Sequence, residues 1–266
     1  MSKQFDALVT LISKRLGISR EECESACLAI AKEDPFNPVE EFLAATSWDG
    51  QDRISTLLND IMGLSIQSEK ETVKRWLHQT LALAFNDDSN ETDHALYGAE
   101  GVLVLVGKQG CGKTLLLSKL AVDRELFCEG AEINLKNKAL TRGMISHWIT
   151  ELCYLGDFGK AEEDFIKSCT DNYRGPYEKA EALRSRRTSF SASVCNNSEV
   201  PASSLLWTVN ADNFNLAAIK ALNEDWIKQL WKQVYEELYL PNPEGFYSSE
   251  GKADTTDTAN TASNSR

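Results

Sequence analysis

The sequence predicts an α/β fold in which a parallel-type central sheet follows a helical N-terminal region and precedes a C-terminal helix and a disordered tail. Three observations lead to this prediction. The run Val102–Val106 is short, continuous and rich in β-branched residues, which is typical of a strand buried on both faces of a parallel sheet. A glycine-rich turn follows this run and leads into a helical pattern at residues 114–120. Two further strand candidates, residues 144–153 and 188–195, alternate with helical and loop segments.

The first part of the chain is predicted to be helical. Residues 5–33 carry apolar positions at helical spacing, and Gly17 interrupts the pattern, so we expect two helices there. Asn37-Pro38 begins another helical segment. Apolar positions at residues 54–61 open the next helix, and residues 69–85 form a further amphipathic one.

The segments that follow complete the predicted organisation. The polar stretch at residues 86–93 is predicted to be a surface loop, and residues 224–239 return to a strong helical period. Residues 248–266 lack large apolar side chains, which is typical of a disordered tail. The predicted segments are residues 1–93, a helical region; residues 94–243, the sheet domain with C-terminal helices; and residues 244–266, the tail.

Net charge, cysteine spacing and the lengths of apolar runs exclude several classes of function. The formal net charge of −12 argues against general nucleic-acid binding, which depends on basic side chains, so any such site must be a local basic patch. The seven cysteines are scattered without a C-x-x-C pair and far from the three histidines, so neither a disulfide framework nor a zinc site is predicted. The sequence carries no secretory signal and no apolar run of membrane-spanning length, so we expect a cytoplasmic protein.

The turn after the first strand carries the chemistry. It fits the pattern G-x-x-x-x-G-K-[ST] in full, with Gly107, Lys108, Gln109, Gly110, Cys111, Gly112, Lys113 and Thr114. The glycines let consecutive N–H groups face inward as an anion-binding nest, and the following helix adds its positive N-terminal end. Lys113 is expected to reach the β- and γ-phosphates and the Thr114 hydroxyl to hold Mg²⁺, so the sequence predicts a P-loop NTPase core that binds ATP.

A P-loop needs an acidic residue at the end of a neighbouring strand, to order Mg²⁺ and the attacking water. Glu151, which ends a candidate strand, is the predicted catalytic and metal-binding carboxylate. Asp157 is the second choice for the metal. The alternative reading makes Glu151 a solvated helix residue.

Two further groups are candidates for the site. Arg186 and Arg187 belong to a basic cluster before the third candidate strand, and three roles stay open for it: contact with DNA phosphate, action on a neighbouring subunit's nucleotide, or a solvated surface. Asn196 follows the same strand, where its amide is expected to lie near the γ-phosphate.

At this point the chain resembles the virulence-associated protein E family, P-loop ATPases of phages, prophages and phage satellites. The resemblance covers about residues 37–235 and is specific as a combination of motifs. Four stretches carry it: NPVEEFL at residues 37–43 with Trp48-Asp49-Gly50 and Arg53; the strand and P-loop at residues 102–114; WITEL at residues 148–152; and DNYRGPY at residues 171–177 with Arg186-Arg187-Thr188.

The resemblance implies an ATPase similar to superfamily-three helicases that acts in the DNA replication of a phage or mobile element. It implies single-stranded DNA as a partner, a homo-oligomeric ring such as a hexamer, and a bacterial cell or infected host as the location. Arg174, within the DNYRGPY stretch, joins Arg186 and Arg187 as a residue for nucleic-acid or inter-subunit contacts.

The chain departs from the family pattern in three places. Tyr154 replaces a second glutamate, and Cys195 or Asn196 stands where the family ends its sensor strand with asparagine. The family's paired arginines before a tryptophan are missing from residues 202–207. Such arginines contribute roughly a thousandfold or more in rate, so slow hydrolysis is expected unless Arg142 or Arg174 replaces them.

Two other functions remain open. A nucleotide-binding regulator or anti-phage interaction protein could keep the P-loop without motor activity. A small-substrate kinase shares the P-loop as well, because a fold does not by itself give a function.

Overall fold

The computed structural model describes residues 3–33, 36–86, 100–134, 136–153, 155–156, 158–168, 187–196 and 198–241. Contacts divide the chain into two units, Met1–Glu41 and Phe42–Arg266. This division differs from the three predicted segments, because the helices after residue 41 belong with the sheet. The predicted boundary at residue 93 and the tail at residues 244–266 lie outside the described residues, so they stay predictions.

The first unit contains two helices, α1 (Lys3–Leu16) and α2 (Arg20–Glu33). Gly17 has a φ of 68°, a left-handed conformation that glycine adopts without strain, and its N–H bonds to the Ser13 carbonyl at 2.9 Å. Ser19 and Glu22 then form a reciprocal capping box, with bonds of 2.8 and 3.1 Å. The predicted break at Gly17 is confirmed.

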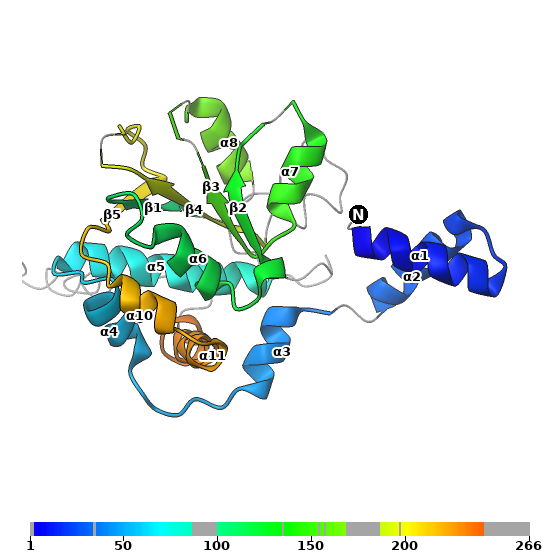
Figure 1. Cartoon of the computed structure of the whole chain (residues 1–266), viewed down its shortest axis with the longest axis horizontal. Helices are drawn as coiled ribbons and strands as arrows, with labels where there is room; N and C mark the ends of the chain where they lie inside the picture. Colours follow the sequence, from blue (N-terminus) through cyan, green and yellow to red (C-terminus); the bar gives the residue numbers. More distant parts are fainter. Residues whose placement is uncertain are drawn as a thin grey trace, which may run out of the picture. The chain divides into compact units, whose positions relative to one another are not determined.

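The second unit is built on a five-stranded sheet whose strand pairs are all parallel (Figure 1). The strand order is β2-β3-β4-β1-β5. The strands are β1 (Val102–Val106), β2 (Phe127–Ala131), β3 (Ile149–Leu152), β4 (Ser189–Val194) and β5 (Leu206–Asn210). The predicted parallel sheet is confirmed.

One strand prediction is too long, and two strands lack a prediction. The candidate at residues 144–153 is too long, because Met144 and Ile145 end helix α7 (Lys138–Ile145) and the strand begins only at Ile149. Strands β2 and β5 were not predicted at all. Both lie at the edges of the sheet, where partial exposure replaces the continuous apolar run of a central strand.

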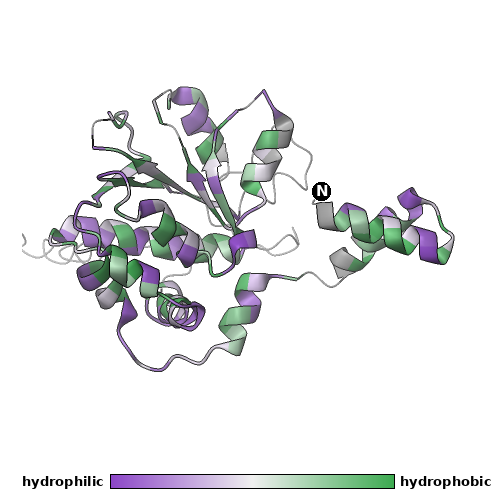
Figure 2. Cartoon of the chain, viewed as in Figure 1, coloured by the Kyte–Doolittle hydropathy of each residue, from purple (hydrophilic) through white to green (hydrophobic). Residues whose placement is uncertain are grey.

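Helices cover both faces of the central strand β1. Val102 and Val104 belong to a hydrophobic cluster that includes Met144 of α7 and Phe165 of α8 (Lys160–Ser168). The alternate residues of β1 are buried as well, as a central parallel strand requires. Figure 2 shows that the strands are largely hydrophobic, whereas the helices carry mixed faces.

The other helical elements of the second unit lie before, between and after the strands. They are α3 (Pro38–Ala45), which crosses the boundary between the units, α4 (Arg53–Thr56), η1 (Leu57–Ile61), α5 (Gln67–Ala84), α6 (Lys113–Leu120), η2 (Arg124–Leu126), α10 (Leu216–Ala221), α11 (Glu224–Gln233) and η3 (Val234–Tyr239). Within the described part of the chain, the helices are too short or too polar to span a membrane.

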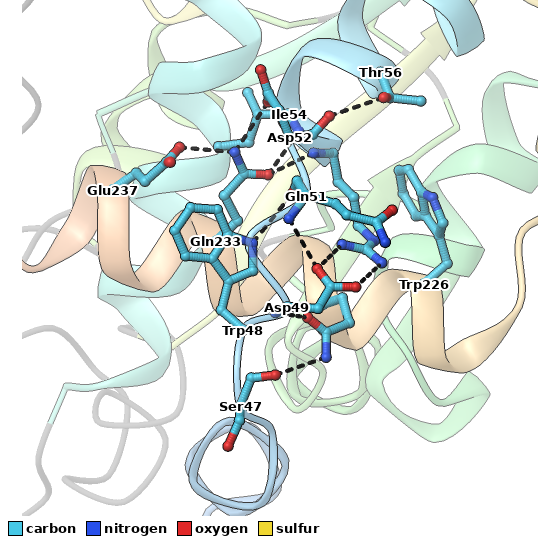
Figure 3. A network of polar contacts seen from close by, with 12 residues as sticks. Ser47, Trp48, Asp49, Gln51, Asp52, Ile54, Thr56, Trp226, Gln233 and Glu237 are labelled. Atoms are coloured by element: carbon cyan, nitrogen blue, oxygen red, sulfur yellow. Dashed lines mark hydrogen bonds and ion pairs between the residues drawn. The ribbon is translucent and has the colours of Figure 1, made fainter.

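Two glutamines of α11 hold residues 47–54 against the C-terminal helices (Figure 3). The side-chain oxygen of buried Gln233 accepts the N–H groups of Arg53 and Ile54, at 2.8 and 3.0 Å. One turn earlier, the side-chain oxygen of Gln229 accepts from the Asp49 N–H at 3.0 Å. Its Nε2 donates to the main-chain oxygen of Ser47 at 2.9 Å. The Arg53 guanidinium bonds both oxygens of Asp49, at 2.6 and 2.7 Å, and lowers the pKa of that carboxyl to about 2.

Gln233→Leu should destabilise the second unit by about 1–3 kcal/mol, because the Ile54 N–H would lose its acceptor and the Arg53 N–H would keep only the Gln51 carbonyl. Gln229→Leu, at a partly exposed position of the same helix, should cost less than half as much. Urea unfolding of both variants measures the difference. Equal and small losses would show that Gln233 does not anchor this segment.

Candidate functional site

The glycine-rich turn lies at the carboxyl end of β1, and its backbone needs glycine at defined positions. Gly110 and Gly112 have φ values of 78° and 103°, in the left-handed region. A Cβ atom at Gly107 would lie 2.9 Å from the Cβ of Ala211, so the loop packs too closely on the end of β5 for a larger residue. The turn then enters α6, whose first residue is Lys113.

Lys113 is buried and lies across this loop. Its Nζ donates to the main-chain oxygens of Gly107 and Lys108, at 2.8 Å each, and lies 3.8 Å from the sulfur of Cys111. The ammonium group and the N-terminus of α6 therefore place positive charge at the same point. This combination suits a bound anion with several oxygen atoms.

Glu151 lies on β3 beside the start of α6, with only 3 % of its surface exposed. Its Oε1 accepts a hydrogen bond from the Thr114 hydroxyl at 2.8 Å and a second one from the Ser193 hydroxyl of β4. Burial raises the pKa of Glu151, and these two hydrogen bonds partly oppose the rise. The structure thus brings Thr114 and Glu151 together, and Glu151 is not a solvated helix residue.

Asn196 reaches the same loop through a residue that the sequence analysis missed. Its Nδ2 donates to both carboxylate oxygens of Asp212 at 3.0 Å, and Asp212 Oδ1 also accepts the Lys108 N–H at 3.0 Å. The Asn196 hydrogen bond and the Lys108 N–H lower the pKa of Asp212. Asp212 follows β5, so only the recognition of that edge strand would have pointed to it.

Of the remaining predicted residues, Arg187 is described and is not brought to the loop. Arg187 precedes β4, at the opposite end of the sheet from the loop, and its Nε donates to the main-chain oxygen of Asn86 at 2.9 Å. Asp157, Arg174 and Arg186 lie outside the described residues, as does the side chain of Arg142. Lys108, Gln109 and Gly110 are exposed on the loop, and Cys111 is partly exposed.

The oxygen atoms at this site fit Mg²⁺ bound together with a phosphate ligand. Mg²⁺ prefers hard oxygen ligands and is usually held by one or two protein groups with water and substrate phosphates. The Thr114 hydroxyl and the Glu151 carboxylate supply such oxygens, 2.8 Å apart. Over the described ranges, no group of three or more His, Cys, Asp or Glu side chains forms a self-contained metal site.

Comparisons with known proteins give one family. A family model described as the virulence-associated protein E-like domain matches residues 43–264. A solved structure, the A form apo structure of the NrS-1 C-terminal region, aligns with 13% identity and a TM-score of 0.41. That alignment covers 77% of this chain and 48% of the other, so the chain spans about half the length of that structure. No curated protein matches.

Glu151→Gln should stabilise the protein at neutral pH in the absence of nucleotide. The pKa of Glu151 in the folded state is raised above its ordinary value of 4.5, so folding disfavours the ionised form at pH values above the raised pKa. Glutamine keeps the oxygen that Thr114 and Ser193 bond but removes the buried charge. We expect a melting temperature higher by about 2 °C or more at pH 7.5.

The difference should shrink as the pH falls toward 4.5, because Glu151 then takes up a proton. Glu132→Gln, the same change at an exposed carboxylate directly after β2, serves as the control and should leave the melting temperature within about 1 °C. Thermal unfolding between pH 4.5 and 8 tests the prediction. A lower melting temperature of E151Q at neutral pH would contradict it.

Proposed function

Because the chain belongs to the virulence-associated protein E-like domain family, we propose that it binds Mg-ATP at the loop of residues 107–114 and hydrolyses it in the DNA replication of a phage or mobile element. The proposal includes single-stranded DNA and further copies of the chain, arranged in a ring, as partners. It includes the bacterial or infected-cell cytoplasm as the location. The family's resemblance to superfamily-three helicases is the basis for these partners.

The hydrogen bond between Thr114 and Glu151 is the observation that carries the proposal. An ordinary glycine turn needs no acidic partner, and a buried carboxylate is costly to keep ionised. Here a carboxylate with 3 % exposure lies against the first turn of the helix that follows the loop. A metal-assisted phosphoryl transfer site accounts for this arrangement, since it requires both oxygen groups at the metal.

Each residue then has a role. The N–H groups of residues 108–114 and the N-terminus of α6 would hold the phosphates. Lys113 would exchange its bonds to the Gly107 and Lys108 carbonyls for bonds to the β- and γ-phosphates. Thr114 and Glu151 would hold Mg²⁺, which when bound neutralises charge on the phosphates. The raised pKa of Glu151 also suits a group that orients and deprotonates water.

A regulator that binds nucleotide with little turnover is the second candidate. The absence of the paired arginines at residues 202–207 and the replacement of a second glutamate by Tyr154 favour it. Without a supplied arginine, charge that develops on the transferred phosphoryl group is less well stabilised, so turnover is expected to be slow. An arginine supplied by a neighbouring copy or a partner would stabilise that charge and speed turnover.

Measurements of ATP turnover and of ATP affinity, with and without single-stranded DNA, test the proposal. The wild type should turn over ATP slowly and faster with DNA. Glu151→Gln should lower turnover by about 100-fold or more and leave ATP affinity within about threefold. Lys113→Ala should weaken ATP binding by about tenfold or more, because a buried charge-assisted contact to phosphate is lost.

Lys220→Ala, which removes an exposed lysine of α10, is the matched control and should behave as the wild type. Tight ATP binding without ATP turnover, even with single-stranded DNA, would indicate a nucleotide-binding regulator. Transfer of phosphate to a small acceptor instead of water would indicate a kinase. A wild-type protein that binds no ATP would refute all three nucleotide-binding functions, and equally tight ATP binding by the wild type and Lys113→Ala would refute the role given to Lys113.

A further inference from the structure

The end of β5 contributes a carboxylate to the loop that no part of the G-x-x-x-x-G-K-[ST] motif specifies. Asp212 accepts the N–H of Lys108 at 3.0 Å and, with both of its oxygens, the amide of Asn196 at 3.0 Å. It therefore joins the first part of the loop to Asn196, two residues after the end of β4. Both groups that donate hydrogen bonds to Asp212 are neutral, and the charges of Lys108 and Lys113 attract its carboxylate as well.

Asp212 is held in place by its surroundings. Its own N–H donates to the Asn210 side chain at 2.8 Å, and the N–H of the preceding Ala211 bonds to the Val106 carbonyl at 2.7 Å. Gly107, at the start of the loop, packs directly on Ala211. The carboxylate thus has a fixed position relative to β1 and the loop.

Asp212 places a negative charge of the protein itself beside a loop that suits a bound anion. The loop, the Lys113 ammonium and the N-terminus of α6 together favour an anion. Asp212 is ionised at neutral pH, since its hydrogen bonds lower its pKa. A phosphate oxygen would accept from the same kind of donor as the Lys108 N–H and the Asn196 amide, and a carboxylate near it repels it.

We propose that Asp212 is a positioning residue that occupies the Lys108 N–H and the Asn196 amide in the nucleotide-free protein and opposes the terminal phosphate of ATP. This inference rests on the proposed function. When nucleotide binds, the Asn196 amide gives up its hydrogen bonds to Asp212 and donates to the triphosphate instead. The charge of Asp212 weakens triphosphate binding more than diphosphate binding, because the terminal phosphate adds negative charge.

Calorimetric titration with Mg²⁺ and the non-hydrolysable analogue AMP-PNP, and separately with Mg-ADP, tests this inference. Asp212→Asn keeps an oxygen for the Lys108 N–H and removes the charge. It should bind AMP-PNP about three- to tenfold more tightly, with a smaller gain for ADP, as expected for one partly screened charge. Asp212→Glu, which restores the charge, should bind AMP-PNP within about twofold of the wild type.

A merely structural role for Asp212 gives the opposite sign, because loss of the carboxylate would loosen the loop and weaken binding. Equal or weaker AMP-PNP binding by Asp212→Asn, or equally tight binding by Asp212→Glu and Asp212→Asn, would therefore overturn the inference. Asp212→Ser provides a second neutral variant if Asp212→Asn does not fold, as judged by its melting temperature. If the wild type itself binds no nucleotide, the proposed function fails instead.

Discussion

One carboxylate oxygen, Oε1 of Glu151, links three elements of the fold around the glycine-rich loop. It accepts from the Thr114 hydroxyl on α6 and from the Ser193 hydroxyl on β4, while Glu151 itself belongs to β3. The first turn of the loop helix is thereby tied to two central strands. Because the carboxylate is buried and its pKa is raised, the protein keeps a group that is costly to ionise. Groups whose burial lowers the stability of the fold in this way are common at functional sites.

The division of the chain into two units agrees with the extent of the family match. The second unit begins at Phe42, and the family model begins at residue 43. The helical segments after residue 42 are part of this unit, because Gln229 and Gln233 bind residues 47–54 to the C-terminal helices. The sequence suggested one helical region up to residue 93, since helical periodicity alone does not show which helices pack together.

How far the sequence could predict the structure depended on burial. The central strand β1 is buried on both faces, so its continuous apolar run was recognisable. The edge strands β2 and β5 mix polar and apolar residues and were missed. The loop was predictable because its glycines and lysine each meet a backbone or charge requirement. Glu151 was predictable from its place at the end of a strand, but Asp212 depended on the unrecognised strand before it.

We propose that Thr114 and Glu151 form the Mg²⁺ side of a nucleotide site. The most direct test is the affinity for ATP measured with and without Mg²⁺ in the wild type, in Thr114→Val and in Thr114→Ser. Mg²⁺ should strengthen ATP binding by the wild type and by Thr114→Ser, which keeps the hydroxyl, and should have little effect on ATP binding by Thr114→Val. An ATP affinity that does not respond to Mg²⁺ in the wild type, or that responds equally in all three proteins, would contradict it.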